Sequence, residues 1–295
     1  MTLPQVTAVT LNWNRPDDTL ACLASLKEQT YPNLQLLVVD NGSSDDSVAR
    51  IQSEFPDVTL LAHPHNSGFA RGNNLGISQA LDHGADFVFC LNNDTWLAPD
   101  AIEQLVAVAR DKTALLSPII YYAEDTRRVW GLGGHFNHWL LEVRQIGQRE
   151  LDQGQWPSVL VVDFVPACGL LLPRPILETA GLFDERFFMY YEDLDYCQRV
   201  RQAGWPILAL TTAKMWHKVS VSSGGSDSPN ERYWMARSSL LYFRKHARPW
   251  QWPLIAFWRL GSALRTSWRL GQRGRGDALR AYWRGLCDGL RERPL

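Results

Sequence analysis

The chain contains 295 residues, of which 45% are hydrophobic and 21% charged, and its formal net charge is −1. This length is sufficient for a buried core, and the composition excludes an intrinsically disordered chain. The charge is unevenly distributed, since the segment from Pro249 to Leu295 holds nine arginines and only three acidic residues. Such a segment favours an anionic surface as its partner. We expect no nucleic-acid partner.

The five cysteines are widely separated and show no paired spacing. We interpret them as small buried side chains in a reducing cytosol, not as a disulfide set or a zinc site. The first residues, "MTLPQVTAV", show no basic region leading into an apolar run, and no stretch of about 18 apolar residues occurs. We therefore expect a cytoplasmic protein without a membrane span. Peripheral contact with the inner face of the cell membrane stays open.

The first hundred residues alternate between strand-like and helix-like patterns. The predicted strands are residues 6–13, 34–40, 58–62 and 87–91, and the predicted helices include residues 47–55 and 73–83. Pro16, Ser44 and Pro99 stand where helix starts are expected. Strands and helices in alternation with short connections predict an α/β fold with a mostly parallel sheet. Ligands bind such sheets beyond the carboxyl ends of the strands.

The second half of the chain is less regular at first. Residues 116–165 are more typical of hairpins than of helices, and "ACGLLLPRP" predicts a short buried strand. A helix is expected from about Tyr191 to Gly204, and another from Asn230 to His246. We predict a catalytic domain at residues 1–225, with a donor-binding half up to about residue 115 and an acceptor half at 116–225. Residues 226–295 form a helical extension.

Polar residues follow the first two predicted strands. Asp40 ends the second strand, and the stretch "DNGSSDDS" after it is also typical of a simple turn and helix cap. The functional interpretation is that Asp40 accepts a hydrogen bond from a pyrimidine base. Leu11, Asn12 and Trp13 at the end of the first strand would hold the other side of the base.

The stretch "NSGFARGNN" follows the third predicted strand. Gly68 allows a close backbone approach, and Arg71 offers a guanidinium group to a diphosphate. Asn66 and Asn74 flank this pair and are expected to contribute to donor binding. The stretch is neither a P-loop nor a dinucleotide-binding G-x-G-x-x-G motif. A glycine-rich start of a helix with a solvated arginine is the alternative.

Three further stretches carry charged or amide groups. "CLNNDTWL" follows the fourth strand and is also compatible with an ordinary turn. "YYEDLDYCQR" places three acids in the first turn of a helix, where they compensate its dipole, but aromatic residues precede them. A carboxylate among aromatics gains proton affinity and suits a general base. His217 follows a short strand, where a structural role is the alternative.

Together these motifs resemble those of family 2 glycosyltransferases, in their order and approximate spacing over residues 5–220. The chain looks most like bacterial rhamnosyltransferase-type members. The resemblance implies a GT-A fold, with a Rossmann-like sheet flanked by helices, and an inverting transfer of a sugar from a nucleotide diphosphate to an acceptor hydroxyl.

The resemblance also assigns roles to residues. The Asp-x-Asp position of the family corresponds to Asn92, Asn93 and Asp94, so Asp94 is expected to bind Mg²⁺ or Mn²⁺ while the two amides contact the donor. His217 matches a position that can complete this metal or diphosphate site. The Glu-Asp motif of the family matches Glu192 and Asp193. Asp193 would be the base, and Glu192 would help to orient the acceptor.

The predicted donor is dTDP-L-rhamnose, with UDP-hexoses second, and the predicted acceptor is a cell-surface glycan or a lipid-linked saccharide of cell-envelope polysaccharide biosynthesis. A sugar-phosphate nucleotidyltransferase is one rival, although the stretch "NWNRPDDT" after the first strand lacks the expected glycines. A non-catalytic sugar-nucleotide-binding protein is another, and the retained Asp94 and Asp193 argue against it.

The C-terminal extension alternates tryptophan with arginine. Leu254, Ile255, Trp258 and Leu264 can share one helical face, and this composition suits a helix lying in the membrane plane. The glycines of the extension are expected to break it into short pieces. The alternative is that the aromatic residues pack as ordinary core.

Overall fold

The computed structural model describes residues 3–219 and 227–291. The predicted boundary between residues 225 and 226 lies outside the described residues. The chain forms two compact units. The sheet unit comprises residues 3–135, 145–186 and 192–219, and the helical unit comprises residues 136–144, 187–191 and 227–291.

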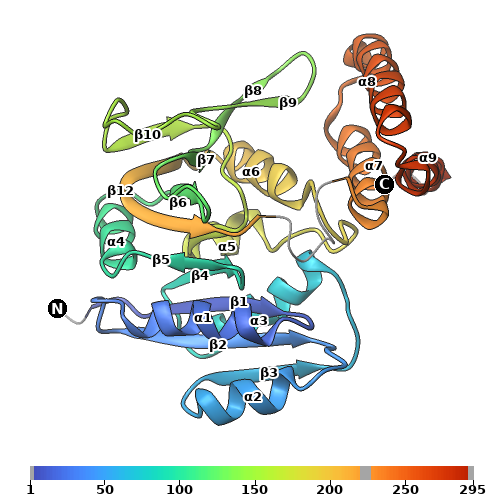
Figure 1. The fold of residues 1–295 in the computed structure, drawn as a ribbon. Helices are drawn as coiled ribbons and strands as arrows, with labels where there is room; N and C mark the ends of the chain where they lie inside the picture. The colour runs from blue at the N-terminus through green and yellow to red at the C-terminus, as the bar shows by residue number, and fades with distance from the viewer. Residues whose placement is uncertain (1–2, 220–226, 292–295) are drawn as a thin grey trace. The chain divides into compact units, whose positions relative to one another are not determined.

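The first half of the chain alternates strands and helices, as predicted (Figure 1). The elements are β1 (Val6–Asn12), α1 (Pro16–Lys27), β2 (Leu34–Asn41), α2 (Ser47–Glu54), β3 (Thr59–His63), α3 (Phe69–Asp82), β4 (Phe87–Asn92), β5 (Thr95–Leu97) and α4 (Ala101–Asp111). The next elements are β6 (Leu115–Tyr122), β7 (Val129–Gly131), β8 (Gly134–Asn137), β9 (Glu142–Gln145), β10 (Val159–Val162), β11 (Gly169–Pro173), α5 (Arg174–Ala180), α6 (Glu192–Gln202) and β12 (Ile207–His217).

The main sheet is mixed, and its longest path in the described residues runs β10-β12-β6-β11-β4-β1-β2-β3. Strands β3, β2, β1 and β4 are parallel to one another, and β6 and β12 form a second parallel pair. Strand β11 lies antiparallel between the two groups. In the register, Asn12 pairs with Asp40 and Leu11 pairs with Asn92, so the predicted donor-binding residues share one edge of the sheet.

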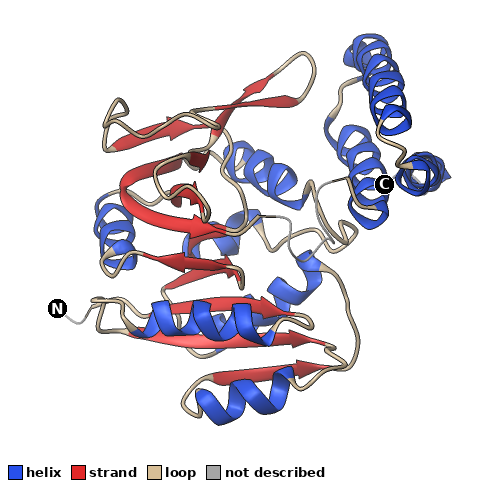
Figure 2. Ribbon diagram, viewed as in Figure 1, coloured by secondary structure: helices blue, strands red, loops and turns tan. Residues whose placement is uncertain are grey.

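Helices pack on both faces of the parallel strands (Figure 2). Side chains of a strand point alternately to its two faces, and Ala8 joins a core cluster with Leu23 of α1. The neighbouring Val9 points to the other face, where α3 lies so close that a Cβ on Gly76 would be 2.3 Å from the Val9 side chain. Gly76 therefore lets α3 approach the sheet.

One predicted helix start was wrong. Helix α3 begins at Phe69, four residues before the expected start, because Gly68 adopts a φ of 89° and serves as its N-cap. The region predicted to be more typical of hairpins than of helices contains strands, among them β6, a central eight-residue strand that is almost fully buried. Its run "LLSPIIYY" is apolar on both faces, as is usual for a strand covered on both sides.

The helical unit contains α7 (Pro229–His246), a 3₁₀ turn (Pro249–Gln251), α8 (Trp252–Gln272) and α9 (Gly276–Arg291). Helix α7 matches the predicted helix closely. The expectation that glycines break the tail into short pieces was wrong for Gly261 and Gly271, which lie within α8. A glycine in a helix costs only about 1 kcal/mol, which the twenty-one-residue helix tolerates.

Cys287 is exposed, in contrast to the expected burial of all cysteines, whereas Cys22, Cys90, Cys168 and Cys197 are buried. Within residues 3–219 and 227–291, no helix is long and apolar enough to cross a membrane.

Candidate active site

The ends of β1 and β2 form a buried polar network around Asp40. Asn12 Nδ2 donates to Asp40 Oδ2 over 2.8 Å, and the Ser43 hydroxyl donates to the same oxygen over 2.5 Å. The Ser43 N–H donates to Asp40 Oδ1 over 3.0 Å, and Asn12 Oδ1 accepts from Thr19 over 2.7 Å. The Asn12 side chain is therefore engaged within the protein, while Asp40 Oδ1 retains capacity for a further N–H donor.

The loop after β3 is held by amides. Asn66 Oδ1 accepts from Gly68 N–H over 2.9 Å and from Asn41 Nδ2 over 3.1 Å. Asn41 Oδ1 in turn accepts from the Ser67 N–H over 3.0 Å. Asn41 was not identified from the sequence, because an asparagine after Asp40 is an ordinary turn residue. These bonds fix the loop that leads into α3.

Helix α3 places Arg71 and Asn74 differently. Asn74 Nδ2 donates to the Phe183 carbonyl over 2.9 Å, and Asn74 Oδ1 accepts from the Phe183 N–H over 3.0 Å. The amide thus ties α3 to the segment before Glu185. Arg71 is exposed, with its Nε 3.8 Å from a Glu185 carboxylate oxygen. Such an exposed pair is weak, so the guanidinium can exchange it for a diphosphate.

The stretch from Asn92 to Asp94 turns between β4 and β5. Strand β5 runs antiparallel to β12 with Thr95 opposite His217, so Asp94 lies beside the end of β12. Asp94 Oδ1 lies 3.1 Å from His217 Nε2, and Asn92 Nδ2 lies 3.5 Å from the same nitrogen. The Lys218 N–H donates to the Asp94 carbonyl over 3.0 Å. The structure thus brings His217 to Asn92 and Asp94, from which it lies far apart in the sequence.

These side chains carry unused polar atoms. Within the described part of the chain, Asn92 Oδ1 and His217 Nδ1 are buried without a hydrogen-bond partner, and the buried Asp94 Oδ1 has His217 Nε2 as its neighbour. The described residues contain no group of three or more potential His, Cys, Asp or Glu ligands. Mg²⁺ is commonly held by one or two carboxylates, with water and substrate phosphates completing its octahedron. One carboxylate with a neighbouring imidazole therefore fits a divalent ion that is bound together with a diphosphate.

Asn93 points elsewhere than its neighbours. Its Nδ2 donates to the Thr19 hydroxyl over 2.9 Å, in a buried contact with α1. Thr19 also donates to Asn12 Oδ1, so Asn93 joins the network that holds Asp40. Its side chain supports the site from behind, whereas Asn92 and Asp94 face His217.

Glu192 and Asp193 open α6, which begins at Glu192 as the sequence predicted to within a residue. Tyr190 and Tyr191, directly before them, have φ values of 65° and 67°. Two consecutive left-handed residues other than glycine are costly, and such strain clusters at functional sites. In the helical unit, the Tyr191 ring packs on Tyr242, with ring centroids 5.6 Å apart.

Both carboxyl groups have raised proton affinity. Burial raises the pKa of Asp193 from its ordinary 3.8 to about 6, although N–H donors from Leu194 and Ala167 lower it. Burial raises the pKa of Glu192 well above its ordinary range, and the charge of Asp193 adds to the effect. Glu192 Oε2 has no hydrogen-bond partner among the described residues. A carboxylate with a pKa near 6 is suited to general base catalysis near neutral pH.

Residues 167 and 168 link the two carboxylate sites, a role that no pattern in the sequence indicates. The Asn92 N–H donates to the Cys168 carbonyl over 3.1 Å, while the Ala167 N–H donates to Asp193. Burial raises the pKa of the Cys168 thiol, and the negative charges of Asp94 and Asp193 raise it further. Both carboxylates therefore lie close to the segment that enters β11.

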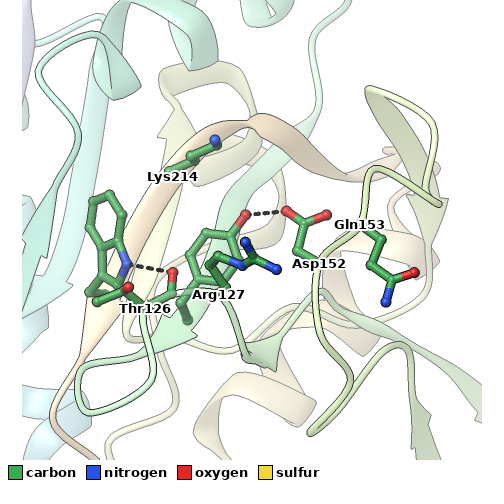
Figure 3. A pocket seen from close by; sticks show the side chains of 7 residues that line it. Thr126, Arg127, Asp152, Gln153 and Lys214 are labelled. Carbon is green, nitrogen blue, oxygen red and sulfur yellow. Dashed lines mark hydrogen bonds between the residues drawn. The ribbon is translucent and has the colours of Figure 1, made fainter.

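A separate pocket of about 440 Å³ lies on the other face of β12 (Figure 3). Lys214 and Trp216 line it, and strand alternation points them away from the side to which His217 projects. Tyr121 donates to Asp152 over 2.5 Å across this pocket. None of the predicted site residues lines it. It therefore lies apart from the site at the strand ends.

A mixed α/β sheet with a buried Asp94–His217 pair and a carboxylate of raised pKa near the ends of its strands is the arrangement expected of a GT-A fold. A family model described as "Glycosyl transferase family 2" matches residues 7–171. The chain therefore belongs to glycosyl transferase family 2.

Curated relatives agree with this assignment. The dTDP-rhamnosyl transferase RfbF of Shigella flexneri is 26% identical over 242 residues, covering 78% of this chain and 76% of the relative. An N-acetylglucosaminyl-diphospho-decaprenol L-rhamnosyltransferase of Mycobacterium tuberculosis is 28% identical over 270 residues, covering 83% and 86%. The expected resemblance to rhamnosyltransferases is confirmed.

Solved structures confirm the fold. GalNAc-T7 with UDP, GalNAc and Mn²⁺ matches with a TM-score of 0.64 at 14% identity, over 84% of this chain. This chain spans about half of that protein, 52% of its length. The mannosyltransferase PcManGT from Pyrobaculum calidifontis, in complex with GDP-Man and Mn²⁺, matches with a TM-score of 0.60 at 16% identity. The match covers all of this chain and 77% of PcManGT.

Proposed function

We propose that this glycosyltransferase moves L-rhamnose from dTDP-L-rhamnose to an acceptor hydroxyl, with inversion at the anomeric carbon. The observation that supports the reaction type is that the segment at residues 167 and 168 contacts both Asp193 and the strand that leads to Asp94. The choice of donor is supported by the two rhamnosyltransferase relatives.

The donor would bind along the strand ends. Asp40 Oδ1 accepts the ring N–H of the pyrimidine, and the exposed Trp13 directly follows Asn12, which pairs with Asp40 in the sheet register. Arg71 leaves Glu185 for the diphosphate. Asp94 and His217 would hold a Mg²⁺ or Mn²⁺ ion, which supplies positive charge against the departing diphosphate.

Asp193 would accept the proton of the acceptor hydroxyl while that oxygen attacks the anomeric carbon from the face opposite the diphosphate. This displacement needs one base and no carboxylate nucleophile. Glu192, whose high pKa favours the protonated form, can donate a hydrogen bond to an acceptor oxygen from its unpaired side. Glu192 would thus orient the acceptor.

A donor screen tests this proposal. The wild-type protein is incubated with Mn²⁺ and with dTDP-L-rhamnose, UDP-glucose, UDP-galactose or GDP-mannose, and nucleotide diphosphate release is measured. We expect the fastest release from dTDP-L-rhamnose. Asp57→Asn, at an exposed site, serves as a control that should keep full activity. Faster release from another donor would refute the choice of rhamnose.

Transfer from a UDP-hexose is the second candidate. Asp40 favours neither base, because uracil and thymine present the same ring N–H to its carboxylate. This candidate is supported by the structural similarity to GalNAc-T7, which was crystallised with UDP. Selective thermal stabilisation by UDP-glucose or UDP-galactose over dTDP-L-rhamnose would favour it.

The proposed acceptor is a glycan or a lipid-linked saccharide of cell-envelope polysaccharide synthesis. The Mycobacterium tuberculosis relative is named for a lipid-linked acceptor, N-acetylglucosaminyl-diphospho-decaprenol. A lipid-linked acceptor would place this protein at the cytoplasmic face of the membrane, with the C-terminal extension in peripheral contact.

A further inference from the structure

Helix α8 is apolar on two opposite sides. Ile255, Ala263 and Leu270 are buried within the helical unit. On the other side, Phe257 is 77% exposed and Trp268 is 69% exposed. A helix with apolar residues all round is usually buried, so the exposed side of α8 calls for an apolar neighbour.

The exposed side forms a continuous face. Its large side chains recur at intervals of three or four residues, which places them on one side of a helix. They are Leu254, Phe257, Leu260, Leu264 and Trp268. We call these five residues the α8 face. The sequence-based grouping was wrong for Ile255, which points to the buried side because it is offset by one residue from Leu254.

Tryptophans lie at both ends of the α8 face. Trp268 lies at its C-terminal end, and Trp250, in the turn before α8, is 54% exposed. Trp250 packs edge-to-face on Trp139, with ring centroids 5.4 Å apart, and Trp139 is also exposed. Tryptophan favours the boundary between lipid headgroups and acyl chains, so rings at both ends suit a helix that lies flat on a bilayer.

The charges that helix α8 itself carries have one sign. Helix α8 contains three arginines and no acidic residue. Arg259 turns inward, donating to Ser239 over 2.7 Å, and Arg269 donates to buried Asp227 over 3.0 Å. Arg265 is exposed beside Leu264 and forms no ion pair or hydrogen bond with a described residue. Arg275, just beyond the helix, is exposed as well.

This charge distribution favours an anionic lipid surface over a second copy of the chain. A two-fold interface would place identical faces together, so Arg265 and Arg275 would meet positive charges without an acidic partner from α8. Anionic headgroups, in contrast, attract arginine beside an apolar helix face.

The helix is already held in place before binding. Asp227 accepts hydrogen bonds from Arg269 and Arg273, the latter over 2.7 Å, and Trp258 donates to Glu142 over 2.7 Å. Because these contacts order α8 in the free protein, binding to a surface does not require folding of the helix.

We propose that the α8 face binds an anionic bilayer, inserting Phe257, Leu260, Leu264 and Trp268 among the lipids while Arg265 contacts the headgroups. This inference deepens the proposed function by naming the surface that brings the enzyme to a lipid-linked acceptor. It does not depend on the identity of the donor sugar.

The test is co-sedimentation of the full-length protein with vesicles of phosphatidylcholine, with or without phosphatidylglycerol. We expect binding to the anionic vesicles, and weaker binding when salt rises from about 0.1 M to about 1 M, because the Debye length falls from about 10 Å to about 3 Å. The double variant Phe257→Asp/Leu264→Asp should bind at least about tenfold more weakly.

Leu290→Asp is the matched control, since Leu290 is 66% exposed on α9 but lies outside the α8 face. It should bind vesicles like the wild type. Phe257, Leu264 and Leu290 are exposed, so the variants should fold like the wild type. Circular dichroism of each variant checks this. Wild-type protein that does not bind, or a double variant that binds equally well, overturns the proposal. So does a wild-type dimer in light scattering that the double variant converts to a monomer.

Donor turnover separates this proposal from the proposed function. The double variant should release nucleotide diphosphate from the donor at the wild-type rate in the absence of lipid. If the wild type has no donor turnover but binds anionic vesicles through the α8 face, the proposed function fails and the membrane surface stands.

Discussion

Replacing Asp193 with asparagine should make the protein more stable and almost inactive. Burial raises the pKa of this carboxyl group from 3.8 to about 6, so the folded state binds its proton more tightly than the unfolded chain does. Above about pH 6 the folded protein therefore carries a charge on a half-buried side chain, and it would be more stable without this charge. Asparagine has nearly the same shape and no charge.

The size of the gain follows from the same two values. The difference between a pKa of 3.8 and one of about 6 corresponds to about 3 kcal/mol in the free energy of unfolding. The gain of Asp193→Asn should be near this value at about pH 8 and should shrink as pH falls through 6. It should vanish below about pH 4, where Asp193 is protonated in both states.

Urea denaturation at several pH values, followed by circular dichroism, measures this gain. Donor turnover of the same variant should fall by about a hundredfold or more, as expected for loss of a general base. Calorimetry should show nearly unchanged affinity for dTDP. Asp57→Asn, with its side chain 86% exposed, should change neither stability nor turnover.

Two results would refute this reasoning. A variant with wild-type stability at every pH would show that Asp193 is solvated in the folded protein. Equal losses of dTDP affinity and turnover would show that Asp193 supports the helix start and the binding site instead of acting on the acceptor proton.

Three further outcomes are expected. Because the base must be deprotonated, kcat/KM of the wild type should be half-maximal near pH 6 and about a tenth of its plateau near pH 5; an acid limb near pH 4 would contradict the raised pKa of Asp193. Asp94→Ala should remove the enhancement of dTDP affinity by Mn²⁺ in calorimetry, and retained enhancement would exclude Asp94 as a ligand. Gly285→Ala should lower the free energy of unfolding by more than about 1 kcal/mol, because its Cβ would lie 2.3 Å from the Tyr233 carbonyl oxygen. Gly261→Ala meets open space and should raise the free energy of unfolding by about 0.5–1 kcal/mol. Equal urea midpoints for the two variants would refute the close packing of α7 and α9.

The sequence predicted the parallel half of the fold well, because its signals are local. Strand β1 and strand β2 are short apolar runs bounded by turn residues, and their pattern specifies both the elements and the edge where Asn12 and Asp40 meet. The central strand β6 was missed because its apolar run has no alternation that distinguishes it from neighbouring hairpins.

The site was predicted in part for the same reason. Asp94, His217 and Asp193 stand in recognisable motifs, and the structure brings Asp94 to His217 as the motif pattern implied. The partners of Asn74 and Asn93 could not be predicted, because they are residues far away in the sequence. Asn74 contacts Phe183 and Asn93 contacts Thr19, and no local pattern indicates these tertiary contacts. The role of Ala167 was invisible because it acts through its backbone N–H.

The segment at Ala167 and Cys168 has a consequence for how such enzymes diversify. The Cys168 carbonyl accepts from the Asn92 N–H, and the Ala167 N–H donates to Asp193, so one short piece of backbone sets the spacing between the Asn92–Asp94 turn and Asp193. Backbone contacts of this kind survive most side-chain substitutions. The loops around these strand ends can therefore vary in sequence while the Asn92–Asp94 turn and Asp193 keep their separation.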